Sequence, residues 1–143
     1  MSSEQEVQSA SKQFYSALNQ LMKGNVGPMA EVWSHSADVS AMHPAGPRAD
    51  GWDNVKGSWA MLAGVAQGGE VSLNDQRIMV SGELACEVGV EKGKANLAGH
   101  PLVFDHRVTN VYRREGGKWK LAHHHADRSE AMEEVAAKLQ SGG

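Results

Sequence analysis

The sequence predicts an α+β domain, because patterns typical of helices come first along the chain and patterns typical of strands follow. Up to about Gly64, apolar residues mostly recur every three or four positions, as on one face of a helix. From Val71 to Ala126, apolar and polar residues alternate between short turns that contain glycine. Helices followed by a meander of strands favour an antiparallel sheet over a parallel sheet with alternating helices.

Four helices are predicted, each from an apolar stripe with a start or stop signal. Gly24 ends the first helix, and Pro28 can begin the second because proline is tolerated in a first helical turn. Asp127 and Ser129 are both suitable N-caps for the last helix. The predicted helices are Ser3 to Lys23, Pro28 to Trp33, Trp52 to an end near Gly64 to Gly69, and a C-terminal helix with Met132, Val135, Ala136 and Leu139. We expect the terminal Ser-Gly-Gly to be frayed.

Five strands are predicted, and the last two form a hairpin. Gly116 and Gly117 supply the positive φ angles of a tight turn. The strands are Ala37 to Met42, Val71 to Val80, Leu84 to Glu91, Leu102 to Arg114 and Lys118 to Ala126. Turns are expected at Ser81-Gly82-Glu83 and Lys92-Gly93-Lys94. Three N-terminal helices cover one face of such a sheet and leave the other exposed, so we expect a homodimer.

The last strand predicts a ligand pocket. Strict alternation places Trp119, Leu121, His123 and His125 on one face, and it turns His124 to the opposite face, toward the surface or an interface. An apolar face that ends in two imidazoles is what a small-molecule site on a curved sheet would present.

Composition narrows the classes of function. The 143 residues suffice for one domain, with a core at 3–127 and a helical extension at 128–140. The formal net charge is -3 and no basic stripe is present, so we expect no nucleic-acid partner. Cys86 is the single cysteine, so an internal disulfide is excluded. No signal peptide or membrane-spanning run is visible, and we expect a cytoplasmic protein that does not bind membranes.

The order of these motifs resembles the nuclear-transport-factor-2-like (NTF2-like) superfamily, and within it the SnoaL-like and ketosteroid-isomerase-like branch. The similar stretches are Met42-His43-Pro44 with Gly46 and Gly51, the helix with Trp59, and Thr109-Asn110-Val111-Tyr112. Gly117-Lys118-Trp119 with the histidines after it is also similar to the association domain of calmodulin-dependent kinase II. The resemblance spans roughly Glu4 to Asp127. It implies a cone: a curved antiparallel sheet of 4–6 strands covered by three N-terminal helices, plus an extra C-terminal helix.

The resemblance also implies catalytic positions. Ketosteroid isomerases use a carboxylate base after the first strand, a tyrosine on the first helix and a protonated aspartate on a later strand. These positions correspond here to His43, Tyr15, and Thr109, or Asn110 if the strands contain a bulge. A histidine therefore replaces the base and the acid is lost, which argues against steroid isomerisation. The alternative is that His43 and Tyr15 only form the wall of a pocket.

Six further residues are candidates for ligand binding. Trp33 and Trp59 could stack on a planar ligand, although tryptophan at helical spacing is more often core. Arg107 could bind a ligand carboxylate, or pair with Glu91 or Asp105. SnoaL-like proteins tend to carry an acid at the position of Glu91, although a solvent-facing carboxylate is the simpler explanation. The complete set is Trp33, Trp59, Glu91, Arg107, His123 and His125.

Metal and cofactor sites are not predicted. His123 and His125 with Asp127 could hold a zinc ion, but no cysteine or second histidine pair has recognisable ligand spacing. No nucleotide-binding fingerprint is present either. We therefore expect neither a metal nor a cofactor, and a metal-dependent hydrolase or lyase using the two histidines is the weakest alternative.

These observations predict a small-molecule-binding protein. Its ligand would be a small organic molecule, a carboxylate or a ketone. As an isomerase, cyclase or dehydratase it would use His43 to remove a proton next to a carbonyl, while Tyr15 with Asn110 or Thr109 stabilises the enolate. At least four residues of one set should then line one cavity: Tyr15, His43, Trp59, Arg107, His123 and His125. The alternative is a non-enzymatic oligomerisation or ligand-sensing domain.

Overall fold

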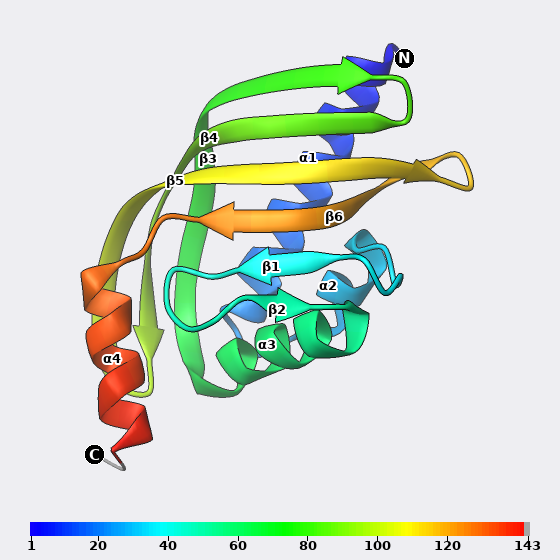
Figure 1. Ribbon diagram of the computed structural model, residues 1–143. Coiled ribbons are helices and arrows are strands. Elements are labelled where there is room, and N and C mark those ends of the chain that lie inside the picture. Colours follow the sequence, from blue (N-terminus) through cyan, green and yellow to red (C-terminus); the bar gives the residue numbers. More distant parts are fainter. Residues whose placement is uncertain (142–143) are drawn as a thin grey trace.

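The computed structural model, which describes residues 1–141, has four helices and one curved six-stranded sheet (Figure 1). The helices are α1 (Ser3–Leu21), α2 (Gly27–Val32), α3 (Trp52–Val65) and α4 (Glu130–Gln140). The strands are β1 (Ser40–Met42), β2 (Ala49–Asp50), β3 (Ala66–Ser81), β4 (Leu84–Leu97), β5 (His100–Glu115) and β6 (Lys118–Ala126). The predicted α+β class is confirmed. The short β2 was not predicted. The predicted fraying concerns residues 141–143: the backbone nitrogen of Ser141 donates to the carbonyl of Ala137, and residues 142–143 lie outside the described part.

The sheet has the strand order β2-β1-β6-β5-β4-β3. Neighbouring strands are antiparallel except β1 and β6, which are parallel. The long strands β3, β4 and β5 bend sharply, so the sheet curls around α1, with α3 below and α4 at the far end from the N-terminus (Figure 1). No helix among residues 1–141 is both long and apolar enough to span a membrane.

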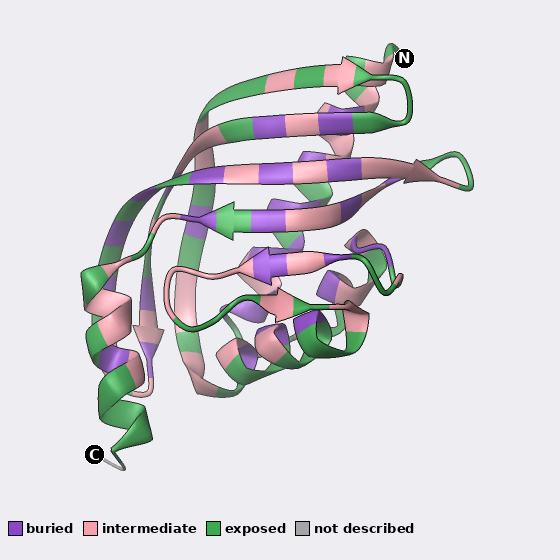
Figure 2. Ribbon diagram, viewed as in Figure 1, coloured by how far each residue is buried: buried purple, intermediate pink, exposed green. Residues whose placement is uncertain are grey.

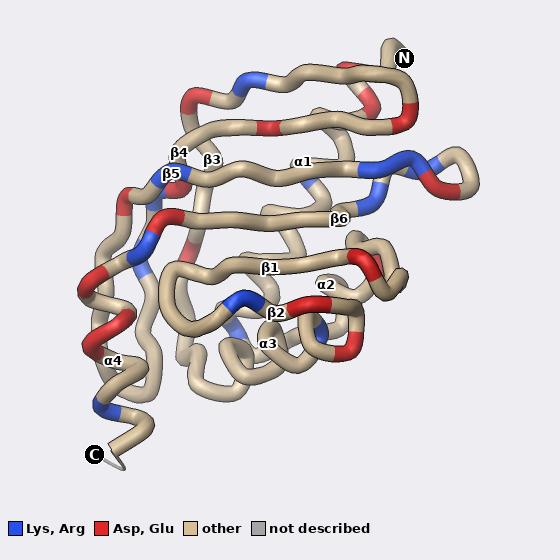
Figure 3. Tube along the Cα trace, viewed as in Figure 1, with Lys and Arg blue, Asp and Glu red and all other residues tan. Residues whose placement is uncertain are grey.

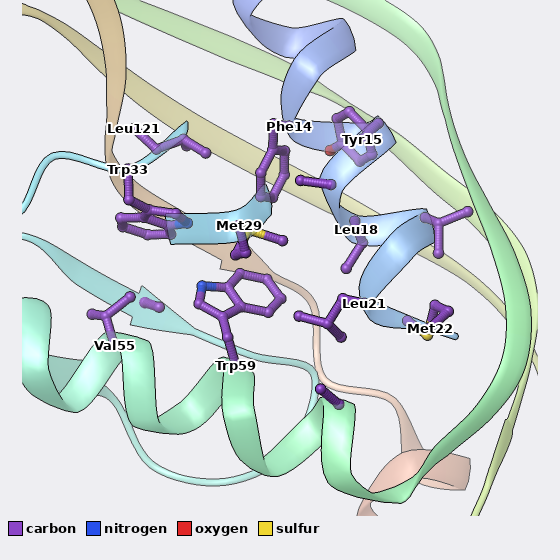
Figure 4. Packing of buried hydrophobic residues seen from close by; sticks show 14 of the residues in the cluster. Phe14, Tyr15, Leu18, Leu21, Met22, Met29, Trp33, Val55, Trp59 and Leu121 are labelled. Atoms are coloured by element: carbon purple, nitrogen blue, oxygen red, sulfur yellow. The ribbon is translucent and has the colours of Figure 1, made fainter. Parts of the chain in front are cut away.

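The core lies between the concave sheet face and α1 and α3. A capping box between Ser2 and Gln5 begins α1, and the apolar stripe of this helix is buried. Trp59 of α3 reaches the ring of Phe14 with a centroid distance of 6.1 Å, and Trp33 lies on its other side at 6.4 Å (Figure 4). These interlocked rings fix the distance between α3 and the sheet.

Strand β4 continues without a turn through Lys92-Gly93-Lys94, so the turn predicted there is wrong. A Cβ atom on Gly93 would lie 2.1 Å from the carbonyl oxygen of Glu70, and one on Gly89 would lie 2.8 Å from that of Asn74. Glycine therefore serves here to let β3 and β4 approach closely where the sheet bends. The actual turn is at Ala98-Gly99, where both residues have the positive φ angles of a two-residue hairpin.

A β-bulge in β6 reverses the predicted faces of the histidines. Val111 of β5 is paired with His123, but Tyr112 is paired with Leu121, so Ala122 is an extra residue in β6. Leu121 and His124 consequently both point inward, with exposed fractions of 0% and 2%. The regular alternation of buried residues along β5 and its interruption in β6 are visible in Figure 2. The prediction that His123 and His125 share the face of Leu121 is wrong, as is a surface position for His124.

The role of Gly93 in the bend is testable by substitution. We expect Gly93→Ala to lower the free energy of unfolding by about 2 kcal/mol or more, because the new methyl group overlaps a backbone oxygen of β3. Gly64→Ala in α3 is the matched control. It meets no atom within 4 Å and should change stability by about 1 kcal/mol at most, as a gain. Equal stability of the two variants in urea unfolding would contradict this account of the bend.

Candidate ligand-binding site

A cavity of about 850 Å³ lies between the concave face of the sheet and helices α1, α3 and α4. Most of its wall is apolar and comes from all three helices and three strands. The apolar lining includes Leu18, Met22, Met61, Leu62, Val65, Val71, Leu97, Phe104, Met132, Val135 and Leu139. Helix α4, expected to be an extension of the domain, therefore forms part of the cavity wall.

One end of the cavity is polar. Its side chains are His43 after β1, Glu91 of β4, His106 of β5 and His124 of β6. Charged residues are spread over the loops, helices and strands (Figure 3). Glu91, within β4, is 3% exposed. A carboxylate is thus held deep inside an otherwise apolar cone.

Glu91 is held by two hydrogen bonds. The hydroxyl of Tyr15 donates to Oε2 at 2.8 Å, and Nε2 of His106 lies 2.8 Å from Oε1. Burial on its own would raise the pKa of Glu91, but the bond from His106, the nearby His124 and the bond from Tyr15 outweigh it and lower that pKa. Glu91 is therefore ionised at neutral pH, and because a carboxylate only accepts, Nε2 of His106 carries a hydrogen.

Asn110 connects this carboxylate to a second one. Its amide nitrogen donates to the hydroxyl oxygen of Tyr15 at 3.1 Å and to Oε1 of Glu87 at 3.0 Å. Glu87 is fully buried and also accepts from Tyr112 and Gln76. Burial and the charge of Glu91 raise the pKa of Tyr15, so its phenol keeps the proton that it donates. Both hydrogens of the Asn110 amide are therefore used inside the protein.

The orientation of Asn110 determines which nitrogen of His124 is protonated. Nδ1 of His124 lies 2.7 Å from Oδ1 of Asn110, an atom that can only accept. Nδ1 therefore donates, and in the neutral ring Nε2 is an acceptor. Burial lowers the pKa of His124 to about 4, so the ring is neutral at physiological pH. No described residue forms a hydrogen bond with Nε2, and His124 lines the cavity.

His43 is also neutral and has the opposite tautomer. Its Nε2 lies 2.7 Å from the hydroxyl oxygen of Ser58, which itself donates to the carbonyl of Val55 at 2.6 Å. Because a carbonyl only accepts, the single hydroxyl hydrogen is used, and Nε2 of His43 must donate. Burial, with a contribution from His124, lowers the pKa of His43 to about 3. The ring packs edge-on against Trp59 at 4.5 Å.

The structure brings some of the predicted residues together. His43, Trp59 and Glu91 line the cavity, and Tyr15 and Asn110 lie directly behind it. Regular alternation along β5 places Asn110 inside, where it is buried, and turns Thr109 outward, where it pairs with His125. However, both donors of Asn110 and the proton of Tyr15 are already used, so the expected enolate-stabilising pair has no free hydrogen.

Four other predicted residues lie outside the cavity, so the placement expected for them is wrong. Trp33 is 2% exposed and belongs to the core. The Arg107 side chain is 84% exposed and pairs with Asp127 at 2.6 Å, because β5 alternation turns it outward. His123 and His125 face outward because of the bulge. Of the six residues expected to share a cavity, His43 and Trp59 line it, which is fewer than the four predicted.

Two cavity histidines were missed. His106 follows the same alternation as Phe104 and Asn110, so strand parity could have identified it. His124 could not have been found that way, because Ala122 breaks the alternation. Within residues 1–141, no three His, Cys, Asp or Glu side chains are arranged to hold a metal ion.

Comparisons with known proteins agree with this architecture. A structure of a candidate dehydratase of the NTF2-like family from Streptomyces avermitilis aligns with a TM-score of 0.76 and 24% identity, over 87% of this chain and 95% of that one. A candidate calmodulin-dependent kinase II association domain from Thiobacillus denitrificans aligns with a TM-score of 0.72 and 23% identity, over 86% and 94%. A candidate ketosteroid isomerase from Shewanella frigidimarina gives 0.67 and 17%, over 83% and 92%. These likenesses establish the fold.

Sequence comparison identifies the family. The F-box protein SKIP8 of Arabidopsis thaliana is 28% identical over 98 residues, which are 68% of this chain. The chain spans about 40% of the length of that protein. The model of the SnoaL-like domain matches residues 7–127. The chain therefore belongs to the SnoaL-like domain family and has the NTF2-like fold.

Proposed function

We propose that this protein binds a small, largely apolar organic molecule in the cone and removes a proton from it, as a cofactor-independent isomerase, cyclase or dehydratase. One observation carries the proposal: a neutral histidine, His124, lines the polar end of the apolar cavity with Nε2 free to accept a proton, close to an ionised carboxylate. A proton acceptor in a site shielded from water is what general base catalysis requires.

The surrounding residues suit this role. When His124 takes up a proton, the negative charge of Glu91 stabilises the imidazolium, and Oδ1 of Asn110 continues to accept from Nδ1. Tyr15 and His106 hold Glu91 in position. Burial lowers the pKa of both His43 and His124, so both rings are neutral at physiological pH. If the imidazolium of His124 returns the proton to another carbon the reaction is an isomerisation, and if it gives the proton to a neighbouring hydroxyl, water leaves and the reaction is a dehydration.

Hydrogen exchange tests this proposal without the complete reaction being known. Hydroxylated aromatic ketones that bind in a thermal-shift screen would be incubated with the protein in D₂O, and deuterium uptake next to the carbonyl would be followed by mass spectrometry. We expect His124→Phe to slow the uptake by about 100-fold or more, because the proton acceptor is lost. His125→Phe, on the outer face of the same strand, should leave it unchanged. Unchanged exchange in the His124→Phe variant would contradict the mechanism.

A second candidate function is assembly without catalysis, and the outer face of the sheet favours it. Met79, Leu84 and Val88 are 68%, 50% and 36% exposed there. The strand register places Met79 beside Cys86, and Cys86 beside Val111, on this same face. Cys86 is half-buried in this position. We infer that a second copy of the chain covers this group, since exposed apolar patches commonly mark interfaces.

Light scattering tests the inferred dimer. The protein should have about twice the 15.4 kDa mass of the chain at micromolar concentration. Val88→Glu should shift the mass toward the monomer, because a charge would be buried in the interface. Val103→Glu, at an exposed position away from this group, is the control and should remain dimeric. A mass near 15.4 kDa for the unaltered chain at every concentration would refute the dimer.

A further inference from the structure

We propose that the polar end of the cavity is an acceptor-only site that binds a hydroxyl group, so that the ligand is a neutral, largely apolar alcohol or phenol. This inference rests on the proposed binding function and narrows the ligand class. It follows from the hydrogens that each side chain at this end can donate, and from where those hydrogens already go.

The residues behind the cavity have no hydrogen left to donate. Tyr15 donates its hydroxyl hydrogen to Glu91. Asn110 donates both amide hydrogens, one to the oxygen of Tyr15 and one to Glu87. Each bond connects buried atoms, and breaking one would leave a buried polar group unsatisfied. These donors are therefore retained by the protein when a ligand enters.

The three histidines at this end use their donors in the same way. His124 donates from Nδ1 to Asn110, His106 from Nε2 to Glu91, and His43 from Nε2 to Ser58. Ser58 uses its own hydrogen on the carbonyl of Val55. Among the described residues, then, these groups offer a ligand no free donor hydrogen, and the unpaired indole nitrogen of Trp59, whose ring also lines the cavity, is itself buried.

Acceptors remain available at the same place. Nε2 of His124 and Nδ1 of His43 form no hydrogen bond with the described part of the chain. Glu91 accepts one hydrogen at each oxygen, and a carboxylate oxygen has a further lone pair. The two rings are 6.1 Å apart, so one small group can lie between them. A ligand gains hydrogen bonds here when it brings the donor itself.

The used donors and free acceptors at this end favour some classes of ligand over others. A carboxylate ligand would bring a second negative charge beside Glu91 and find no free hydrogen on these groups, which is costly in a mostly apolar cavity. A ketone or ether has no hydrogen to give. Arg48 also lines the cavity, but it is paired with Asp50 at 2.8 Å, with a side chain 62% exposed, and so lies at the mouth. An ammonium group would lose its hydration among mostly apolar walls, so a neutral hydroxyl fits best.

Four probes that share one ring system test the inference: 2-naphthol, 2-methoxynaphthalene, 2-naphthoate and 2-(aminomethyl)naphthalene. Titration calorimetry at pH 7.5 should give 2-naphthol the tightest binding, by about ten-fold over each of the others. Equal or tighter binding of any other probe would overturn the inference while leaving the binding function intact. Failure of all four to bind up to their solubility limits would overturn the binding function, and the inference with it.

Two variants test whether the preference for 2-naphthol depends on the acceptors of Glu91 and His124. Glu91→Gln introduces an amide donor, and His124→Phe removes an acceptor while keeping a flat ring against Phe14 and Trp59. In either folded variant, the advantage of 2-naphthol over 2-methoxynaphthalene should fall to about three-fold or less. Glu70→Gln, at an exposed position of β3, is the control and should keep the full ratio. If folded Glu91→Gln and His124→Phe keep the full affinity ratio of 2-naphthol to 2-methoxynaphthalene, the assignment of these residues as the acceptors is overturned. If neither variant folds, the order of affinities of the four probes for the unaltered protein tests the inference.

Discussion

The side-chain amide of Asn110 is the contact on which the polar interior of this protein depends. It donates to Tyr15 and Glu87 and accepts from His124, so three strands and the first helix meet at one residue. An amide can satisfy two acceptors and one donor at once, a combination that neither a hydroxyl nor a carboxylate provides. Two buried carboxylates are thereby held without an arginine or lysine among the partners of Glu87 and Glu91 within residues 1–141.

The cavity exists because the sheet bends but does not close into a barrel. Gly89 and Gly93 allow β3 and β4 to approach closely, and the bent strands leave space between the sheet and α3 that apolar side chains only partly fill. Trp59, which packs against Phe14 and Trp33, forms part of one side, and α4 forms a wall on another. Ser129 caps α4, and its backbone nitrogen also donates to the carbonyl of Pro44, which anchors the helix to the loop that carries His43.

The sequence was sufficient for the fold and for part of the site. The apolar stripe of α1, the tight turn at Gly116-Gly117 and the order of the motifs predicted the architecture correctly. Tyr15, His43 and Glu91 were candidates from the sequence; His43 and Glu91 line the cavity and Tyr15 lies behind it, although a solvent-facing position was the simpler explanation for Glu91. The errors have two local physical causes. Glycine was interpreted as a turn at Gly93, where it allows a bend, and strict alternation was assumed through Ala122, where the strand has a bulge.

The bulge also explains why the chemistry of the site could not be derived from the sequence. A single extra residue in β6 exchanges His123 and His125 for His124 on the inner face. Hydrogen-bond direction is a further property that no sequence pattern contains. Tyr15 was expected to donate to a ligand, but it donates to Glu91. Pattern analysis alone would equally place Glu91 on a solvent-facing side.

The central claim is that burial keeps His124 neutral and that Asn110 places its proton on Nδ1, which leaves Nε2 open to the cavity. Long-range ¹H–¹⁵N NMR of protein with ¹⁵N-labelled histidine measures this directly, with His124→Phe to assign the signals. The account predicts a protonated Nδ1 and an unprotonated Nε2 from pH 7 down to about pH 5, with protonation of the ring only near the lowered pKa of about 4. A proton on Nε2 at neutral pH, or a titration of His124 near the ordinary histidine pKa of about 6.5, would contradict it.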